Sequence, residues 1–173
     1  MRIRPYIAEK DFEYLRGWIT DERMHALWCA NRIPYPLSSE GLNDVLAKNA
    51  MDWNSNAYVA TKDSGEPEGF FCYSLNEENS TGLLTFVVID DSLRGKGYGK
   101  EMMRLALKYA YDISGATSVR LNVFDINVAA RRCYENVGFV ESSITKDAFS
   151  FQDEQWGRCN MVALSDTMET GPT

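Results

Sequence analysis

The chain has 173 residues, of which 45% are hydrophobic and 25% charged, and this composition predicts one packed globular domain rather than a disordered segment. Its formal net charge of −7 disfavours nucleic-acid binding and suits an amine-bearing substrate. Four scattered cysteines and a single histidine argue against a disulfide framework and against a metal site. No stretch resembles a membrane span or a secretion signal, so we expect a cytoplasmic monomer or homodimer that does not bind membranes.

The first half of the chain alternates between short strands and helices. Alternating apolar residues predict a strand at 2–7, and helical spacing of apolar residues predicts helices at 9–19 and 21–29. The prolines at 34 and 36 require an extended segment, after which Ser38 or Ser39 can cap a helix that runs to about residue 50. Strands at 57–61 and 69–75 follow, joined by the glycine- and proline-containing turn at 63–67, which predicts a hairpin.

The second half is expected to contain crossover helices. It is predicted to continue with a strand at 83–90, a helix ending near residue 113, a strand at 118–124, a helix ending at Gly138, and closing strands at 139–145 and 157–164. The aromatic and acidic residues at 149–156 are expected to form the connection between the closing strands. The pattern predicts an α/β fold with a mixed sheet, forming one domain over 1–165, followed by a flexible tail at 166–173.

A glycine-rich turn between the strand at 83–90 and the next helix is the strongest functional signal. Glycines in this position allow a phosphate to approach the backbone N–H groups of a helix start, and two cations lie beside them. The spacing does not match the dinucleotide fingerprint G-x-G-x-x-G, nor a Walker-type loop. It does match R-x-x-G-x-G, read as Arg94, Gly97 and Gly99. A helix-capping turn without a ligand is the structural alternative.

A second motif follows the strand at 118–124. Asp125 or Asn127 can cap the following helix, and Gly138 is suited to end it. The run matches N-x-x-A-x-x-x-Y-x-x-x-G-F, with Asn127, Tyr134 and Gly138 at the defining positions. Together and in this order, the two motifs resemble the GNAT superfamily of acetyl-CoA-dependent N-acetyltransferases, firmly over about residues 81–140.

The resemblance implies a GNAT-type acyl-CoA N-acyltransferase fold, with six to seven strands, about four helices and two splayed parallel strands at 83–90 and 118–124. It implies that the pantetheine arm of acetyl-CoA, the co-substrate, lies in the gap between those strands. The implied cofactor-binding residues are Phe86, Val87, Val88, Ile89, Arg94, Gly95, Lys96, Gly97, Tyr98, Gly99, Lys100 and Asn127.

The implied reaction is transfer of an acetyl group by direct attack of a primary amine, from a small molecule, a peptide N-terminus or a lysine. Tyr134 is the family-matched proton donor for the departing thiolate, because a phenol is a neutral donor at pH 7. A core-facing aromatic is the alternative for Tyr134. Many relatives carry a carboxylate in the strand before the loop, where it can act as the general base. Residues 81–89 contain no carboxylate, so the sequence does not identify the general base. Candidates elsewhere are Glu22, His25, Glu77, Glu78, Asp153 and Glu154, and a water-mediated path is equally compatible.

The acceptor pocket is expected to come from residues 21–37 and 149–156. Trp28, Tyr35 and Trp156 are candidates for stacking on an amine-bearing ligand, and Phe149 and Phe151 are further aromatic residues of these segments. The alternative is that these rings only pack within a lid. His25 and Cys29 lie four residues apart, which also permits a Cys–His nucleophile. Two further functions remain open: a non-catalytic acyl-CoA-binding sensor on the same fold, and a different nucleotide-binding enzyme.

Overall fold

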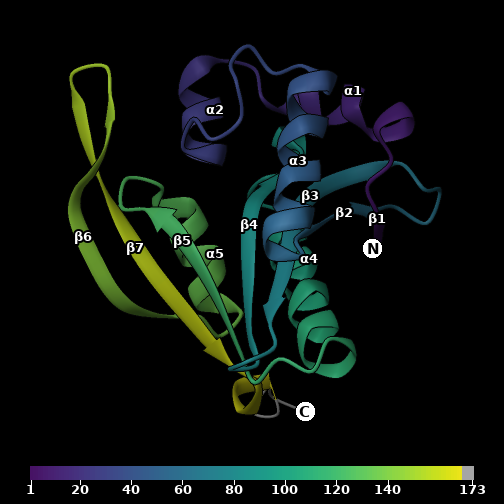
Figure 1. The fold of residues 1–173 in the computed structure, drawn as a ribbon, viewed down its shortest axis with the longest axis vertical. Coiled ribbons are helices and arrows are strands. Elements are labelled where there is room, and N and C mark those ends of the chain that lie inside the picture. The colour runs from purple at the N-terminus through teal and green to yellow at the C-terminus, as the bar shows by residue number, and fades with distance from the viewer. Residues whose placement is uncertain (169–173) are drawn as a thin grey trace. The chain divides into compact units, whose positions relative to one another are not determined.

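The computed structural model describes residues 1–168 and contains five α-helices and seven strands (Figure 1). The chain divides into two compact units, which we describe separately. The first unit comprises Met1–Ser74 and Thr85–Met102, and the second comprises Leu75–Leu84 and Met103–Thr173. The strands form one mixed sheet, as the sequence predicts, and their order in it is β1-β2-β3-β4-β5-β7-β6.

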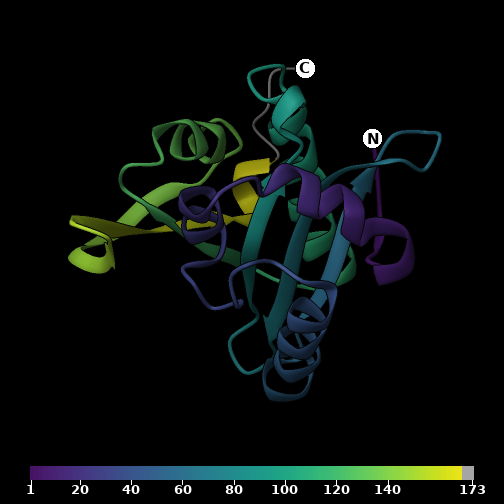
Figure 2. The ribbon, with the colours of Figure 1, turned by 90° about the horizontal axis from the view of Figure 1, so that it is seen from above.

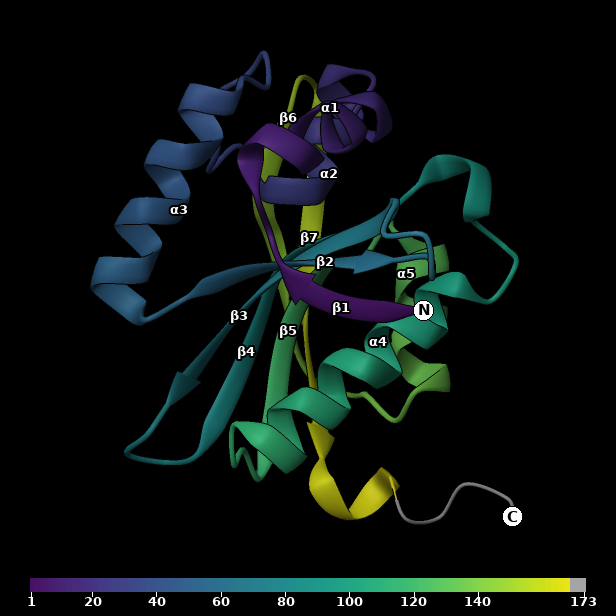
Figure 3. The same ribbon diagram turned by 90° about the vertical axis from the view of Figure 1, so that its right-hand side faces the viewer.

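The first unit contains β1 (Arg2–Pro5), α1 (Ala8–Trp18), α2 (Glu22–Cys29), α3 (Ser39–Trp53), β2 (Asn56–Thr61), β3 (Pro67–Asn76, to Ser74) and the second half of β4 (Thr81–Ile89). Figure 3 shows the three purple-to-blue helices gathered with β1 to β3. They cover a core in which the largest fully buried side chains include Leu15, Ile33, Leu42 and Phe70.

Side-chain caps fix where these helices begin. The Asp21 side chain accepts a hydrogen bond from the Met24 N–H (2.7 Å), and Ser38 Oγ accepts one from the Gly41 N–H (3.0 Å). Both caps satisfy an N–H group that has no partner inside its own helix. The helix that begins after Ser38 continues to Trp53, three residues beyond the predicted end, and stops at Asn54 in the left-handed conformation.

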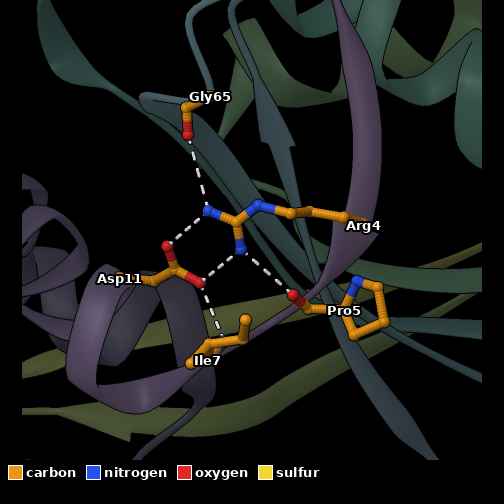
Figure 4. A network of polar contacts seen from close by, with 5 residues as sticks. All are labelled: Arg4, Pro5, Ile7, Asp11 and Gly65. Carbon is orange, nitrogen blue, oxygen red and sulfur yellow. Dashed lines mark hydrogen bonds and ion pairs between the residues drawn. The ribbon is translucent and has the colours of Figure 1, made fainter.

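A buried ion pair joins β1 to α1 (Figure 4). Asp11 is 1% exposed, and both of its oxygens accept from the Arg4 guanidinium at 2.8 Å. Its Oδ2 also accepts the Ile7 N–H (2.8 Å), so the carboxylate caps the start of α1, where Ile7 itself offers no capping side chain. The bidentate geometry and the third hydrogen bond offset the cost of burying this charge.

The second unit contains the first half of β4, β5 (Ser118–Phe124), α5 (Val128–Asn136), β6 (Val140–Phe151) and β7 (Glu154–Leu164). α4 (Tyr98–Lys108) begins in the first unit, and a π-helical segment, Tyr109–Ile113, ends this helical run at the predicted place. α5 lies along β5 and β7 (Figure 2). β4 pairs with β5 in parallel from Thr81↔Ser118 to Leu84↔Leu121, and this register covers only the first four residues of each strand.

The expectation of a connecting loop at 149–156 is wrong. β6 extends to Phe151 and β7 begins at Glu154, so the two strands form one long hairpin with a turn at Gln152 and Asp153 (Figure 1). Stacked aromatic rings hold this end of the hairpin: Trp156 lies against Phe149 and Phe151 at centroid distances of 5.4 and 5.2 Å. The turn at the end of β7, Ser165–Met168, is 3₁₀-helical, and the rest of the predicted tail, 169–173, lies outside the described residues.

Candidate active site

The glycine-rich loop connects β4 to α4 in the first unit. Gly95 and Gly97 have φ angles of +75° and +87°, a conformation that strongly favours glycine. A Cβ atom built on either residue meets nothing within 4 Å, so the loop backbone is open on that side. The Glu101 N–H donates to the Gly97 carbonyl (3.1 Å), which starts the helical hydrogen-bond pattern. The preceding N–H groups, those of Tyr98, Gly99 and Lys100, are therefore the donors that a helix start leaves for an anion.

Arg94 makes two side-chain contacts within the first unit. Its Nη1 contacts Asp91 Oδ1 at 2.9 Å, and its Nη2 lies 3.6 Å from the sulfur of Met24 on α2. Both partners of the ion pair are largely exposed, so the pair is weak and can be exchanged for a phosphate. Arg94, Lys96 and Lys100 give the loop three positive charges beside the backbone N–H groups of the helix start. This combination of charges and donors fits the pyrophosphate of coenzyme A.

β4 carries a feature that the sequence did not indicate. Phe86 lies within the strand yet has a φ of +51°, which is rare for a bulky residue. Its carbonyl accepts a hydrogen bond from the Trp28 indole N–H (2.9 Å). Phe86 is one of the strand residues predicted to contact the cofactor. Its carbonyl already accepts a hydrogen bond from Trp28 within the protein. Val88 is buried, whereas Val87 and Ile89 are half-buried.

The second motif lies in the second unit. Asn127 caps α5, since its Oδ1 accepts the Ala130 N–H at 3.3 Å, which confirms the predicted cap and leaves the amide nitrogen as the group able to donate elsewhere. Tyr134 is 8% exposed, and its ring meets Phe139 edge to face at 6.0 Å. Burial raises the pKa of Tyr134 well above its ordinary value, with a smaller contribution from Cys133. The phenol therefore stays protonated throughout the neutral range.

The three candidate pocket residues lie in different environments. Trp28 and Trp156 are 8% and 1% exposed, and both belong to packed aromatic clusters. Tyr35 is 49% exposed and contacts His25 at a ring distance of 5.1 Å. Burial favours the packing alternative for the two tryptophans and leaves Tyr35 as the accessible aromatic residue of the segment.

The His25–Cys29 pair is buried and neutral. The sulfur lies 3.6 and 3.7 Å from the two ring nitrogens, so the residues do share a helix face. Burial, however, raises the pKa of the Cys29 thiol, and burial lowers the pKa of His25 despite hydrogen bonds to Asn31 and Pro34. A reactive pair needs a thiolate, which this environment disfavours.

The candidate bases are mostly on the surface. Glu22, Glu77, Glu78 and Asp153 are exposed, Glu154 is half-buried and His25 is buried. One further carboxylate, Glu68 at the start of β3, is only 4% exposed, and burial raises its pKa. Its position after Pro67 in the hairpin gives no local sign of burial. Within residues 1–168 no cluster of histidine, cysteine and acidic side chains could hold a metal ion, and no helix is long and apolar enough to cross a membrane.

Known proteins are similar to this chain in sequence, and others in fold. The chain is 26% identical over 127 residues to a spermine/spermidine N(1)-acetyltransferase of Bacillus subtilis, covering 70% of this chain and 84% of that protein. It is 31% identical over 88 residues to a streptothricin acetyltransferase of Streptomyces lavendulae, covering 51% of this chain and 46% of that protein. A crystal structure of spermidine N-acetyltransferase from Vibrio cholerae in complex with CoA and spermine has the same fold, with a TM-score of 0.82, 19% identity and 98% coverage of both chains. The model of the acetyltransferase (GNAT) family matches residues 15–139, more than half of the sequence, so the chain belongs to this family.

Proposed function

We propose that this N-acetyltransferase transfers the acetyl group of acetyl-CoA to a primary amine by direct attack, with Tyr134 as the proton donor. The observation that carries the proposal is the loop of the first unit, where two left-handed glycines open onto the first turn of α4 beside Arg94 and Lys96. Acetyl-CoA supplies the activated acetyl group as a thioester. The chain's own residues bind its phosphates, position the amine and hold the proton that the leaving sulfur requires.

The loop residues 94–100 are proposed to hold the pyrophosphate through backbone N–H groups and the three cations. Strand residues 86–89 are proposed to bind the pantetheine arm, through groups other than the Phe86 carbonyl. Asn127 is proposed to donate its amide N–H to the same arm, because its oxygen is used in the helix cap.

Tyr134 is proposed as the general acid because its environment keeps a proton on the phenol oxygen. Burial raises its pKa, so the O–H stays in place through the neutral and mildly alkaline range in which an acceptor amine loses its proton. A dedicated base is not part of the proposal. An α-amine with a pKa near 8 requires only about 1 kcal/mol to lose its proton at pH 7, so it can react without a dedicated base. A lysine-like amine requires about 4–5 kcal/mol and would benefit more from one.

The names of the relatives suggest polyamines as one class of acceptor to test, and streptothricin suggests a second. We further propose that the protein acts in the cytoplasm as a monomer or homodimer, without binding nucleic acid. The net charge of −7 and four cysteines that form no disulfide support this part of the proposal.

The test is calorimetric titration with acetyl-CoA, followed in the same sample by thiol release on addition of polyamines, amino acids and short peptides. We expect binding followed by release with at least one amine. Binding without release from any acceptor would favour the acyl-CoA sensor, an alternative made less attractive by relatives that are named as enzymes. Absence of binding would contradict the assignment of the loop.

A further inference from the structure

Arg32 is presented by an unusual turn at the end of α2. Ala30 and Asn31 both have left-handed backbone conformations, with φ angles of +52° and +55°, although neither is glycine. The Arg32 N–H donates to the Cys29 carbonyl (3.0 Å), and the next residue, Ile33, is 1% exposed in the core. Two consecutive residues in this region are costly and persist only where their surroundings impose them. The turn therefore fixes the direction in which Arg32 leaves the backbone.

The Arg32 guanidinium lies over the ring of Phe86, with its central carbon 5.1 Å from the ring centroid. Phe86 is itself a rigid support: it is 5% exposed, its ring contacts Trp28 at 5.9 Å, and its carbonyl accepts the Trp28 indole N–H. A cation over an aromatic face gains a modest amount of energy and loses much of its freedom. The charge is thus held beside the β4 segment that is proposed to bind the acetyl-CoA arm.

The charge of Arg32 has no acidic partner in the part of the chain that the structure describes. Arg4 and Arg94, in the same unit, pair with Asp11 and Asp91. Arg32 is exposed, and the N–H groups at the edge of its guanidinium donate to no carbonyl or carboxylate within residues 1–168. Its charge also acts on two buried thiols: burial raises the pKa of Cys29 and raises that of Cys72 to about 12, and Arg32 opposes both shifts.

We infer that Arg32 binds a carboxylate of the acceptor, so that the preferred acceptor is an amine that also carries a carboxylate, such as an amino acid, rather than a polyamine. The inference rests on the proposed function and on the expectation from the sequence that residues 21–37 form part of the acceptor pocket. A guanidinium stacked on a ring still offers its edge to a carboxylate through two parallel hydrogen bonds. The same fixed positive charge repels the second ammonium group of a polyamine.

The experiment compares acceptors that differ only by a carboxylate. Cadaverine is lysine without its carboxylate, and putrescine is ornithine without it. Thiol release gives kcat and KM for these four amines and for spermidine, using the wild-type protein, Arg32→Gln, Arg32→Lys and Arg32→Glu. Arg16→Gln is the matched control, because Arg16 is an exposed arginine of α1 paired with Glu13. Thermal melting and acetyl-CoA titration establish that each variant is folded and binds the cofactor.

We expect the wild-type protein to favour lysine over cadaverine, and ornithine over putrescine, by about tenfold or more in kcat/KM, as for a charge-assisted bidentate pair. Arg32→Gln should abolish this preference by raising the KM for lysine and ornithine, while kcat is retained. Arg32→Lys should keep part of it, Arg32→Glu should reverse it, and Arg16→Gln should leave it unchanged.

Two results would overturn the inference while leaving the proposed function intact. One is equal or better use of cadaverine and putrescine by the wild-type protein. The other is an equal loss for both members of each pair in Arg32→Gln, which would make Arg32 a packing residue. A different result, in which acetyl-CoA binds but none of the five amines releases thiol, would contradict the proposed acceptor class and the inference together.

Discussion

Asp125 and Gly157 exchange two hydrogen bonds: the Gly157 N–H donates to Asp125 Oδ1 (3.0 Å), and the Asp125 N–H donates to the Gly157 carbonyl (2.9 Å). Opposite Gly157, β6 carries extra residues, because Thr145 pairs with Arg158 and Phe149 with Trp156. Asp147, inside this bulge, has a φ of +49°. The carboxylate that follows β5 thus accepts the Gly157 N–H at the point where β6 bulges away from β7.

Replacement of Gly157 by alanine should destabilise the second unit. A Cβ atom there would lie 2.6 Å from Asp125 Oδ2 and 3.4 Å from the Thr145 carbonyl oxygen. Moving the carboxylate breaks its hydrogen bond to the Gly157 N–H, so we expect a loss of about 1–3 kcal/mol in the free energy of unfolding. Chemical denaturation measures it. Gly17→Ala is the control, because a Cβ atom there meets nothing within 4 Å, and alanine in the helix should stabilise by up to about 1 kcal/mol. Equal behaviour of the two variants would contradict the assigned role of Asp125.

Gly97→Ala and Gly65→Ala separate backbone strain from ligand binding. Both glycines have positive φ angles, +87° and +92°, and a Cβ atom on either meets nothing within 4 Å. Each variant should therefore lose about 1–2 kcal/mol of stability from the left-handed conformation alone. Only Gly97→Ala should also weaken acetyl-CoA binding, by about tenfold or more, which corresponds to about 1.4 kcal/mol. Calorimetric titration measures the affinity for acetyl-CoA. If the two variants bind acetyl-CoA equally well, its phosphates do not lie against the loop at Gly97.

Local chemistry made much of the fold predictable. Ser38 and Asn127 cap their helices as expected, and the strand Ser118–Phe124 has the predicted bounds, because these features depend on neighbours in the sequence. The long β6–β7 hairpin was missed, because residues 146–148 bulge out of the pairing between Thr145 and Phe149 and are exposed, so they show no apolar alternation.

The same reason applies to the candidate site. The glycine loop and the Asn127–Tyr134 motif are local patterns and could be found by their spacing. The left-handed backbone of Phe86 and its hydrogen bond from Trp28 join residues 58 positions apart, and no local residue pattern indicates them. For the same reason Trp28 looked accessible in the sequence, although its ring is packed against Phe70 and Phe86 in the core.

Cys29→Ala should leave turnover intact. Burial raises the pKa of the Cys29 thiol and lowers that of His25. Both shifts disfavour the thiolate and imidazolium that a covalent mechanism needs. Removal of the buried sulfur should cost about 1 kcal/mol of stability. Steady-state thiol release measures turnover, and mass spectrometry after incubation with acetyl-CoA alone tests for an acetylated thiol. Loss of turnover in a folded Cys29→Ala protein, together with an acetylated Cys29 in the wild type, would establish the covalent alternative.

Glu68→Gln should change how stability depends on pH. Burial raises the pKa of Glu68 above its ordinary value of 4.5, and the positive charge of Lys62 opposes this only in part. Between the unfolded and the folded pKa the native state binds more protons, so its stability falls as the pH rises through that window. Glutamine removes this loss, so the variant should gain stability relative to wild type as the pH rises above the ordinary glutamate pKa value of 4.5. Denaturation at several pH values measures the difference, and a difference independent of pH would mean that Glu68 ionises freely.

Tyr134→Phe should slow the reaction without weakening acetyl-CoA binding. The variant keeps the buried ring and its contact with Phe139 but loses the O–H, so we expect kcat to fall about 100-fold, as for removal of a general acid, with the affinity for acetyl-CoA retained. Tyr14→Phe, at an exposed position of α1, is the control for loss of a phenol and should be unchanged. Because burial raises the pKa of Tyr134, the wild-type rate should show no alkaline fall from this residue below about pH 10. Full activity of Tyr134→Phe would remove the phenol from the mechanism and leave the residue with the packing role that its burial already supports.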